Sequence, residues 1–147
     1  MNKEAIFNKI VEQEELYVEK LEETLELYRR ASDLDEEGTM DRQDMSQANE
    51  AKDMQMRMRV QLDKANGDLA ELKNVGNKAC EKVEAGALVT TGKAYFFVGV
   101  SLHALNINGK DVYGVSAESP AFKTMYGKVA GDTFELGNDT YSIDEVS

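Results

Sequence analysis

Glycine and proline divide this chain more sharply than any other feature, because both residues break regular secondary structure and nearly all of them lie in one half. Only two of the eleven glycines precede Gly76, and the sole proline is Pro120. Eight glycines lie between Gly86 and Gly137, together with four of the five phenylalanines. The first 75 residues therefore predict long helices, and residues 76–147 predict strands joined by turns.

Two apolar stripes with helical spacing occupy the first 75 residues. One recurs at steps of three and four around a gap at Glu14, and the other repeats at coiled-coil spacing with charged residues on the remaining faces. Residues 32–41 separate the stripes and are too few for anything except a turn, so residues 1–75 predict an antiparallel helical hairpin. The first stripe consists of Phe7, Val11, Val18, Leu21, Leu25 and Tyr28, and the second of Ala48, Ala51, Gln55, Met58, Leu62, Ala65, Leu69 and Leu72.

Residues 76–147 predict a small antiparallel sheet with one short helix, which makes the expected fold class α+β. Asn108-Gly109 suits the positive φ angles of a type I′ turn between two strands. Ser119 offers an N-cap hydroxyl and Pro120 a proline for the first helical turn, so residues 121–126 are expected to be helical. The expected strands cover residues 87–91, 94–102, 103–107, 110–115, 133–136 and 140–146.

Charge and cysteine content exclude several classes of function. The formal net charge is -11, from 28 acidic and 17 basic side chains. Such a charge disfavours binding to phosphate backbones and anionic lipid, so we expect neither recognition of DNA sequence nor membrane association. Cys80 is the single cysteine, which rules out an internal disulfide and a zinc site built from paired cysteines. With no apolar segment of about 18 residues and no signal sequence, a cytoplasmic location is expected.

One segment of the second half resembles the signature of the bacterial Gre transcript cleavage factors, the GreA/GreB family of transcription elongation factors. Ser119-Pro120 is followed by a short helix, then by Gly127-Lys128, two variable residues and Gly131-Asp132, in the order and spacing of that signature. The resemblance implies an FKBP-like β domain over residues 76–147, preceded by a coiled coil. It also implies binding to RNA polymerase at the rim of the secondary channel, with Ser119 and Pro120 as docking residues. We expect the protein itself to be a monomer.

The turn of the predicted hairpin is acidic and is similar to the tip of the Gre coiled coil. Residues 32–36 read Ser-Asp-Leu-Asp-Glu, against Gly-Asp-Leu-x-Glu in the family. The resemblance implies that Asp33 and Glu36 reach the polymerase active site and help to hold its second magnesium ion, which both proteins share only in the complex. Asp35 and Glu37 crowd the same turn and could substitute in part. Beyond Glu36 the sequence departs from the family pattern, and a merely solvated acidic turn is the alternative interpretation.

Two arginines precede the acidic tip by one helical turn. Arg29 and Arg30 are candidate contacts to the displaced 3′ end of the RNA, although arginines among glutamates are also common surface ion-pair partners on helices. His103 and Cys80 have no catalytic partner at a recognisable spacing, and the sequence assigns neither a role.

The sequence therefore predicts an accessory transcription elongation factor, rather than a free-standing enzyme, that stimulates cleavage of backtracked RNA by the polymerase through its acidic tip. It would need no cofactor alone and magnesium only in the polymerase complex. One alternative is a Gre-like homologue that modulates or inhibits the polymerase without stimulating cleavage. A remote alternative is an FKBP-type prolyl isomerase, which would need an aromatic-lined proline pocket. The aromatic candidates for such a pocket are Tyr95, Phe96, Phe97 and Tyr113.

Overall fold

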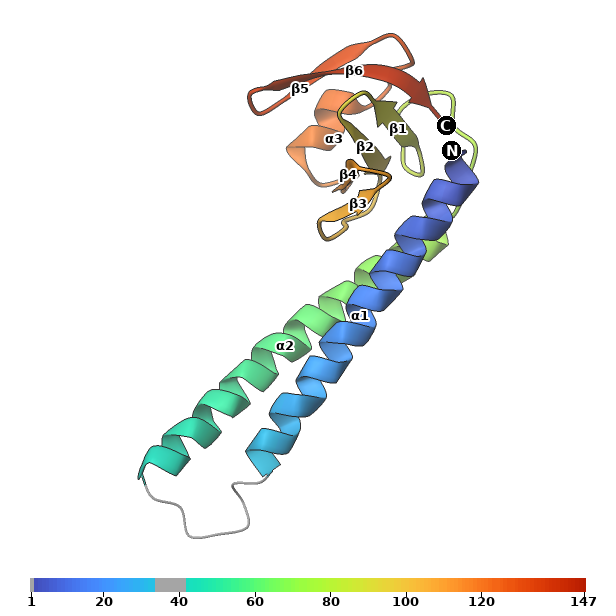
Figure 1. Ribbon diagram of the computed structural model, residues 1–147. Helices are drawn as coiled ribbons and strands as arrows, with labels where there is room; N and C mark the ends of the chain where they lie inside the picture. Colours follow the sequence, from blue (N-terminus) through green and yellow to red (C-terminus); the bar gives the residue numbers. More distant parts are fainter. Residues whose placement is uncertain (1, 34–41) are drawn as a thin grey trace. The chain divides into compact units, whose positions relative to one another are not determined.

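The computed structural model describes residues 2–33 and 42–147, and it confirms the expected α+β fold class, with a helical hairpin followed by a small β-rich domain (Figure 1). Two long antiparallel helices come first, and six strands and one short helix follow. In chain order the elements are α1 (Lys3–Asp33), α2 (Arg42–Val75), β1 (Leu88–Thr91), β2 (Ala94–Val98), β3 (Leu105–Ile107), β4 (Lys110–Val115), α3 (Pro120–Met125), β5 (Thr133–Leu136) and β6 (Asp139–Val146).

The chain forms two compact units, and each helix of the hairpin contributes to both. One unit comprises Met1–Glu14 and Asp68–Ser147, and the other comprises Glu15–Gly67. The predicted domain boundary between residues 75 and 76 coincides with the end of α2. As a boundary between independent domains it stays a prediction.

The buried stripe of α1 differs by one position from the predicted one over its first half. Ile6 and Ile10 are buried there, while Phe7 and Val11 are only half-buried. Glu14, which interrupts the predicted stripe, lies within the buried one. Because Ile6, Ile10 and Glu14 are spaced by four residues, they lie on one helix face together with Val18. The predicted stripe of α2 is confirmed more closely, with its described members buried or half-buried.

The six strands form one sheet in the order β3-β4-β2-β1-β6-β5. Neighbouring strands pair antiparallel except β2 and β4, which run parallel with Phe96 opposite Tyr113. The sequence pattern, which predicts only antiparallel hairpins, does not reveal this pair. The register of β1 against β6 shifts between Thr90 and Thr91.

A close crossing of the chain explains how β4 comes to lie beside β2. β2 ends at Val98 rather than at residue 102, because Gly99 has a φ of 99° and turns the chain away from the strand direction. The following residues then pass directly over Gly114, where a Cβ atom would lie 2.6 Å from the Leu102 amide nitrogen. Only glycine permits such an approach.

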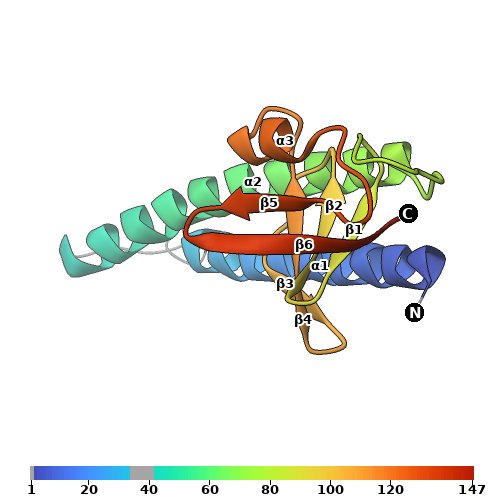
Figure 2. The ribbon, with the colours of Figure 1, turned by 90° about the horizontal axis from the view of Figure 1, so that it is seen from above.

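Each face of the sheet carries its own apolar cluster. The first packs beneath α3, which contacts β5 (Figure 2), and the second contains residues from the base of both long helices. Phe96 and Phe97 therefore belong to different clusters, as expected for successive strand residues. The first cluster includes Val83, Val89, Phe96, Val98, Met125, Phe134 and Ile143. The second includes Ile6, Ile10, Leu72, Leu88, Phe97, Val100 and Val112.

The turns predicted at Asn108-Gly109 and around Gly137 have the expected backbone conformations. Asn108 and Gly109 both have positive φ, 54° and 81°, and join Ile107 to Lys110 as a type I′ turn requires. The last hairpin closes through Gly137, with a φ of 61°, and begins its second strand at Asp139.

Candidate functional site

The predicted docking residues Ser119 and Pro120 begin α3, and both have the local roles expected from the sequence. The Ser119 hydroxyl accepts a hydrogen bond from the Phe122 amide at 3.3 Å and donates one to the Ser116 carbonyl at 2.8 Å. Pro120 occupies the first helical turn, where its missing N–H leaves no bond unmade. Pro120 is exposed, whereas Ser119 is half-buried. Ser119 therefore orients the loop, and Pro120 is the better placed of the two to touch a partner.

The second half of the signature forms a hydrogen-bonded segment after α3. Gly127, with a φ of 81°, ends the helix as predicted and donates from its amide to the Val83 carbonyl at 2.8 Å. Val83 in turn donates to the Lys128 carbonyl at 2.8 Å. The Asp132 carboxylate accepts from the Val129 amide at 2.9 Å and closes the next turn. Gly127 and Asp132 of the signature thus each have a structural role: Gly127 ends the helix, and Asp132 closes the following turn.

The predicted acidic tip is described only at its first residue. Asp33 is the last residue of α1, and Asp35, Glu36 and Glu37 lie outside the described residues. Carboxylate oxygens are the donor type that magnesium prefers, so the chemistry of these side chains fits the ion that the resemblance implies. Among residues 2–33 and 42–147, no group of three or more His, Cys, Asp or Glu side chains could hold a metal ion. The roles of the four tip carboxylates remain predictions.

Arg29 and Arg30 converge on one carboxylate. Arg29 Nη2 lies 3.0 Å and Arg30 Nε 3.3 Å from the same Glu26 oxygen. The hydrogen bond from Arg29 is the main reason that the pKa of Glu26 is lowered, and Arg30 adds to the effect. Both arginine side chains are more than half exposed, so these surface pairs can exchange for another anion at little energetic cost. Contact with RNA stays a prediction for both arginines.

A buried acid–base pair lies within the larger unit and was missed by sequence reasoning. Glu14 Oε1 on α1 lies 2.7 Å from His103 Nδ1 in the segment between β2 and β3. Only 2% of the Glu14 side chain is exposed, against 27% for His103. Burial raises the pKa of Glu14, His103 opposes that shift, and Asp68 on α2 adds to it. The one available signal was the acidic residue interrupting an apolar stripe.

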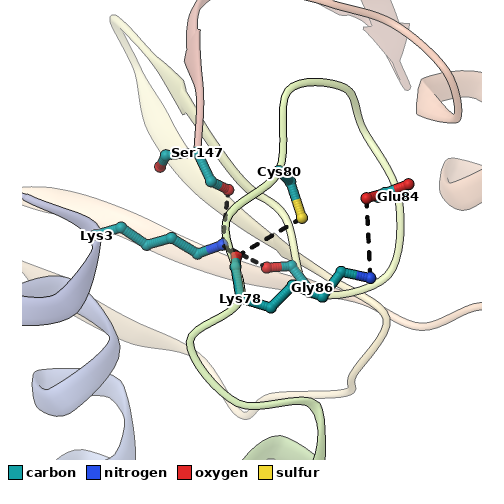
Figure 3. Close-up of polar contacts among 6 residues, drawn as sticks. All are labelled: Lys3, Lys78, Cys80, Glu84, Gly86 and Ser147. Atoms are coloured by element: carbon teal, nitrogen blue, oxygen red, sulfur yellow. Dashed lines mark hydrogen bonds and ion pairs between the residues drawn. The ribbon is translucent and has the colours of Figure 1, made fainter.

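A half-buried charge, Lys3, joins segments far apart in the sequence (Figure 3). Its ammonium group donates to the carbonyls of Gly86 and Ser147, both at 2.7 Å, and to that of Lys78. Burial lowers the pKa of Lys3. Nothing in the sequence pattern indicates this contact, because lysines near the start of a helix are ordinarily solvated.

Cys80 lies beside this ammonium group as a free, buried thiol. Its sulfur donates a long hydrogen bond of 3.7 Å to the Lys78 carbonyl, and burial raises its pKa. A raised pKa disfavours the thiolate, which is the reactive form. The surroundings of Cys80 thus suit a structural contact better than nucleophilic chemistry.

The aromatic residues considered for a proline pocket do not all lie together: the Phe96 and Tyr113 rings are 5.5 Å apart, whereas Tyr95 and Phe97 belong to the other apolar cluster. Tyr95, Phe96 and Phe97 are buried, at 8%, 2% and 0% exposure, and they alternate between the two faces of the sheet. Tyr113 alone is substantially exposed among the four, at 44%. Core packing accounts for the three buried rings, and the structure provides no specific observation in favour of a prolyl isomerase.

None of the helices in the described parts of the chain has the length and apolar character needed to cross a membrane.

Comparison with known proteins gives similarity to solved structures and no match by sequence. No profile of a protein family and no curated protein sequence matches this chain. Among solved structures, the chain is similar to GreA factor homolog 1 (Gfh1) of Thermus thermophilus, with 18% sequence identity and a TM-score of 0.40. The similarity covers 93% of this chain and 94% of that protein.

Proposed function

We propose that this protein is a Gre-like transcription elongation factor that binds RNA polymerase at its secondary channel and stimulates the polymerase's own cleavage of backtracked RNA. The polymerase performs the chemistry, and the factor contributes carboxylates delivered on a helical hairpin. The protein would work in the cytoplasm as a monomer. Magnesium, held jointly in the complex, would supply charge stabilisation during phosphodiester hydrolysis.

The observation that carries the proposal is the Gre-like signature from Ser119-Pro120 to Gly131-Asp132, which follows two long helices that are separated in the sequence by an acidic segment. The signature lies in the β-rich part of the chain, residues 76–147, and Pro120 is exposed. α1 is a helix of 31 residues, and Asp33, the first acidic residue of the predicted tip, is its last residue. At about 1.5 Å per residue, such a helix spans roughly 45 Å, which suits a role in reaching into a channel.

Transcript cleavage on a stalled, backtracked polymerase complex tests the proposal. The parent protein should accelerate release of the RNA 3′ fragment in the presence of magnesium. The double variant Asp33→Asn and Glu36→Gln should lose at least about tenfold of this stimulation, because loss of one carboxylate ligand weakens metal occupancy. Its competition for the polymerase should be nearly unchanged. Lys9→Met, an exposed change far along α1 from the tip, serves as the control.

The same assay separates the proposal from its rival. A parent protein that binds the polymerase without raising cleavage above the intrinsic rate would favour the modulating or inhibitory homologue. Equal stimulation by the parent and the double variant would remove Asp33 and Glu36 from the mechanism. A parent that does not bind the polymerase would overturn both interpretations.

A further inference from the structure

Aromatic rings gather on the face of the sheet that packs against α3, and the part of that face on β4 is open to solvent. Phe96 on β2 is buried, with the Tyr113 ring 5.5 Å and the Tyr141 ring 5.1 Å away. Tyr113 is 44% exposed, so α3 does not cover it. A hollow of about 370 Å³ lies beside this ring. The lining residues of the hollow are Ala104, Leu105, Asn106, Asp111, Val112 and Tyr113.

The carboxylate of Asp111 lies on the same side of β4 as the Tyr113 ring, because residues two apart along a strand point the same way. Its two oxygens accept long hydrogen bonds, one of 3.2 Å from the Asn106 side-chain amide and one of 3.4 Å from the Tyr113 hydroxyl. An ionised carboxylate offers about four acceptor positions, so each oxygen can accept another hydrogen bond. Asp111 is exposed and takes part in no ion pair within the described parts of the chain.

A neighbouring ring on this face already holds a cation from the chain itself. The Lys93 ammonium group lies 5.4 Å from the centre of the Tyr141 ring. Burial raises the pKa of Tyr141, and the negative charges of Asp139 and Asp111 add to the shift. This face therefore attracts positive charge at Tyr141, whereas no lysine or arginine of the described residues lies over the exposed Tyr113 ring. The complementary partner group for Tyr113 and Asp111 is a cation.

We propose that Tyr113 and Asp111 form a docking site for an arginine side chain of a partner protein. The planar guanidinium group can stack on the open face of the Tyr113 ring while its N–H groups donate to the carboxylate oxygens of Asp111. Lysine suits the site less well, because its ammonium group is compact and has no flat face to stack on the ring. The site lies on β4 rather than on α3 or the loop before it, and this inference does not depend on the proposed function.

Titration of the protein with the blocked tripeptide acetyl-Gly-Arg-Gly-amide, followed by amide spectra, tests the site. The amides of β3 and β4 beside the hollow should shift and saturate, with a dissociation constant in the millimolar range expected for one exposed side chain. The same peptide with citrulline keeps the shape of arginine without its charge and should cause no shifts. The lysine peptide should bind at least about twofold more weakly. Absent shifts, or equal shifts with citrulline or lysine, would overturn an arginine site.

Two variants test the contributions of the carboxylate and the ring. Asp111→Asn keeps the size of the side chain and removes its charge, and Tyr113→Leu removes the ring. Each should weaken binding of the arginine peptide by about three- to tenfold. Asp144→Asn, at an exposed position on β6, is the matched control for the charge, and Tyr126→Leu is the control for an exposed tyrosine. Both controls should bind the peptide like the parent.

The outcomes separate a local site from general attraction to an acidic protein. Equal weakening in Asp111→Asn and Asp144→Asn would show that only net charge attracts the peptide and would overturn the site. Unchanged affinity in both Asp111→Asn and Tyr113→Leu would overturn it as well. Amide spectra establish that each variant is folded, and if Tyr113→Leu is not, the comparison of Asp111→Asn with Asp144→Asn decides. The proposed function is tested separately, by transcript cleavage, and would stand if the arginine site failed.

Discussion

Glu14 is the residue whose position is hardest to reconcile with simple burial rules. A carboxylate with 2% side-chain exposure is costly unless it is paired or protonated. His103, 2.7 Å away, supplies the partner from a different segment of the chain. The pair joins α1 to the β-rich part of the same unit, so its ionisation is linked to the stability of that unit.

We expect stability to depend on pH through Glu14. Its folded-state pKa is raised above the ordinary value of 4.5, mainly by burial. The folded protein then binds this proton more tightly than the unfolded chain does, so the stabilisation is complete below about pH 4.5 and is lost as the pH rises through the raised pKa. Glu14→Gln should remove this dependence. Urea unfolding midpoints measured across the acidic and neutral range provide the test.

A second variant, Glu15→Gln, is the control for the pH measurement. Glu15→Gln removes the same charge at the adjacent, exposed position. Its pH profile should follow that of the parent. Parallel profiles for the parent and Glu14→Gln would contradict the role given to Glu14.

Lys3 gives a second prediction for a single side chain. Lys3→Met keeps much of the apolar stem but removes the donor to the carbonyls of Lys78, Gly86 and Ser147. Hydrogen bonds to a charged group typically contribute about 1.5–3 kcal/mol, so the free energy of unfolding should fall by about that much. Lys9→Met, at an exposed position on the same helix, should change it by less than about 0.5 kcal/mol. Urea titration of both variants measures this difference. Equal losses in the free energy of unfolding would show that the three hydrogen bonds of Lys3 contribute nothing measurable.

Among the helices and strands, α3 is the one whose stability we expect to depend most on a single N-cap residue. It has only 6 residues, and its start is fixed by the Ser119 hydroxyl. Ser119→Ala should destabilise the protein by about 1 kcal/mol and speed amide exchange along α3, whereas Ser119→Asp should retain most of the stability. Exchange rates that are equal in the parent and the alanine variant would show that Ser119 is not needed as a cap.

Elements defined by local chemistry were predictable from the sequence, and those defined by distant contacts were not. The turn at Asn108-Gly109 and the start of α3 at Ser119-Pro120 follow from backbone preferences within a few residues. The parallel pairing of β2 with β4 depends on a chain crossing over Gly114, which no local pattern encodes. The same limit explains why Glu14–His103 was missed, since its two halves are far apart in the sequence.

For the whole molecule, the division into units predicts which fragments can fold. Ile6, Ile10 and Leu72 are each 2% exposed or less and pack in the same cluster as Phe97. A fragment of residues 76–147 lacks these side chains, and removal of even one large core side chain typically costs about 2–5 kcal/mol. We therefore expect the fragment to give poorly dispersed amide spectra and no cooperative unfolding transition.

The complementary variant keeps all of that core. Replacing residues 15–67 with a linker of about four glycines and serines, a length common between antiparallel helices, should preserve a cooperatively folded unit. Amide spectra and urea unfolding are measured for this variant and for the fragment of residues 76–147. A well-folded 76–147 fragment would instead support an independent domain with the boundary predicted from the sequence.

The hydrogen bond between Lys3 and Ser147 also bears on when the larger unit can fold during synthesis. A ribosome adds residues from the N-terminus onward, so the first turn of α1 emerges long before the carbonyls of Gly86 and Ser147 have been made. Residues 15–67, which form a compact unit among themselves, can pair during translation. The larger unit cannot close until Ser147 is free to pair with Leu88 and to receive the Lys3 ammonium group. Lys3 and Leu88 therefore gain these partners only after the segment that contains Ser147 has been synthesised.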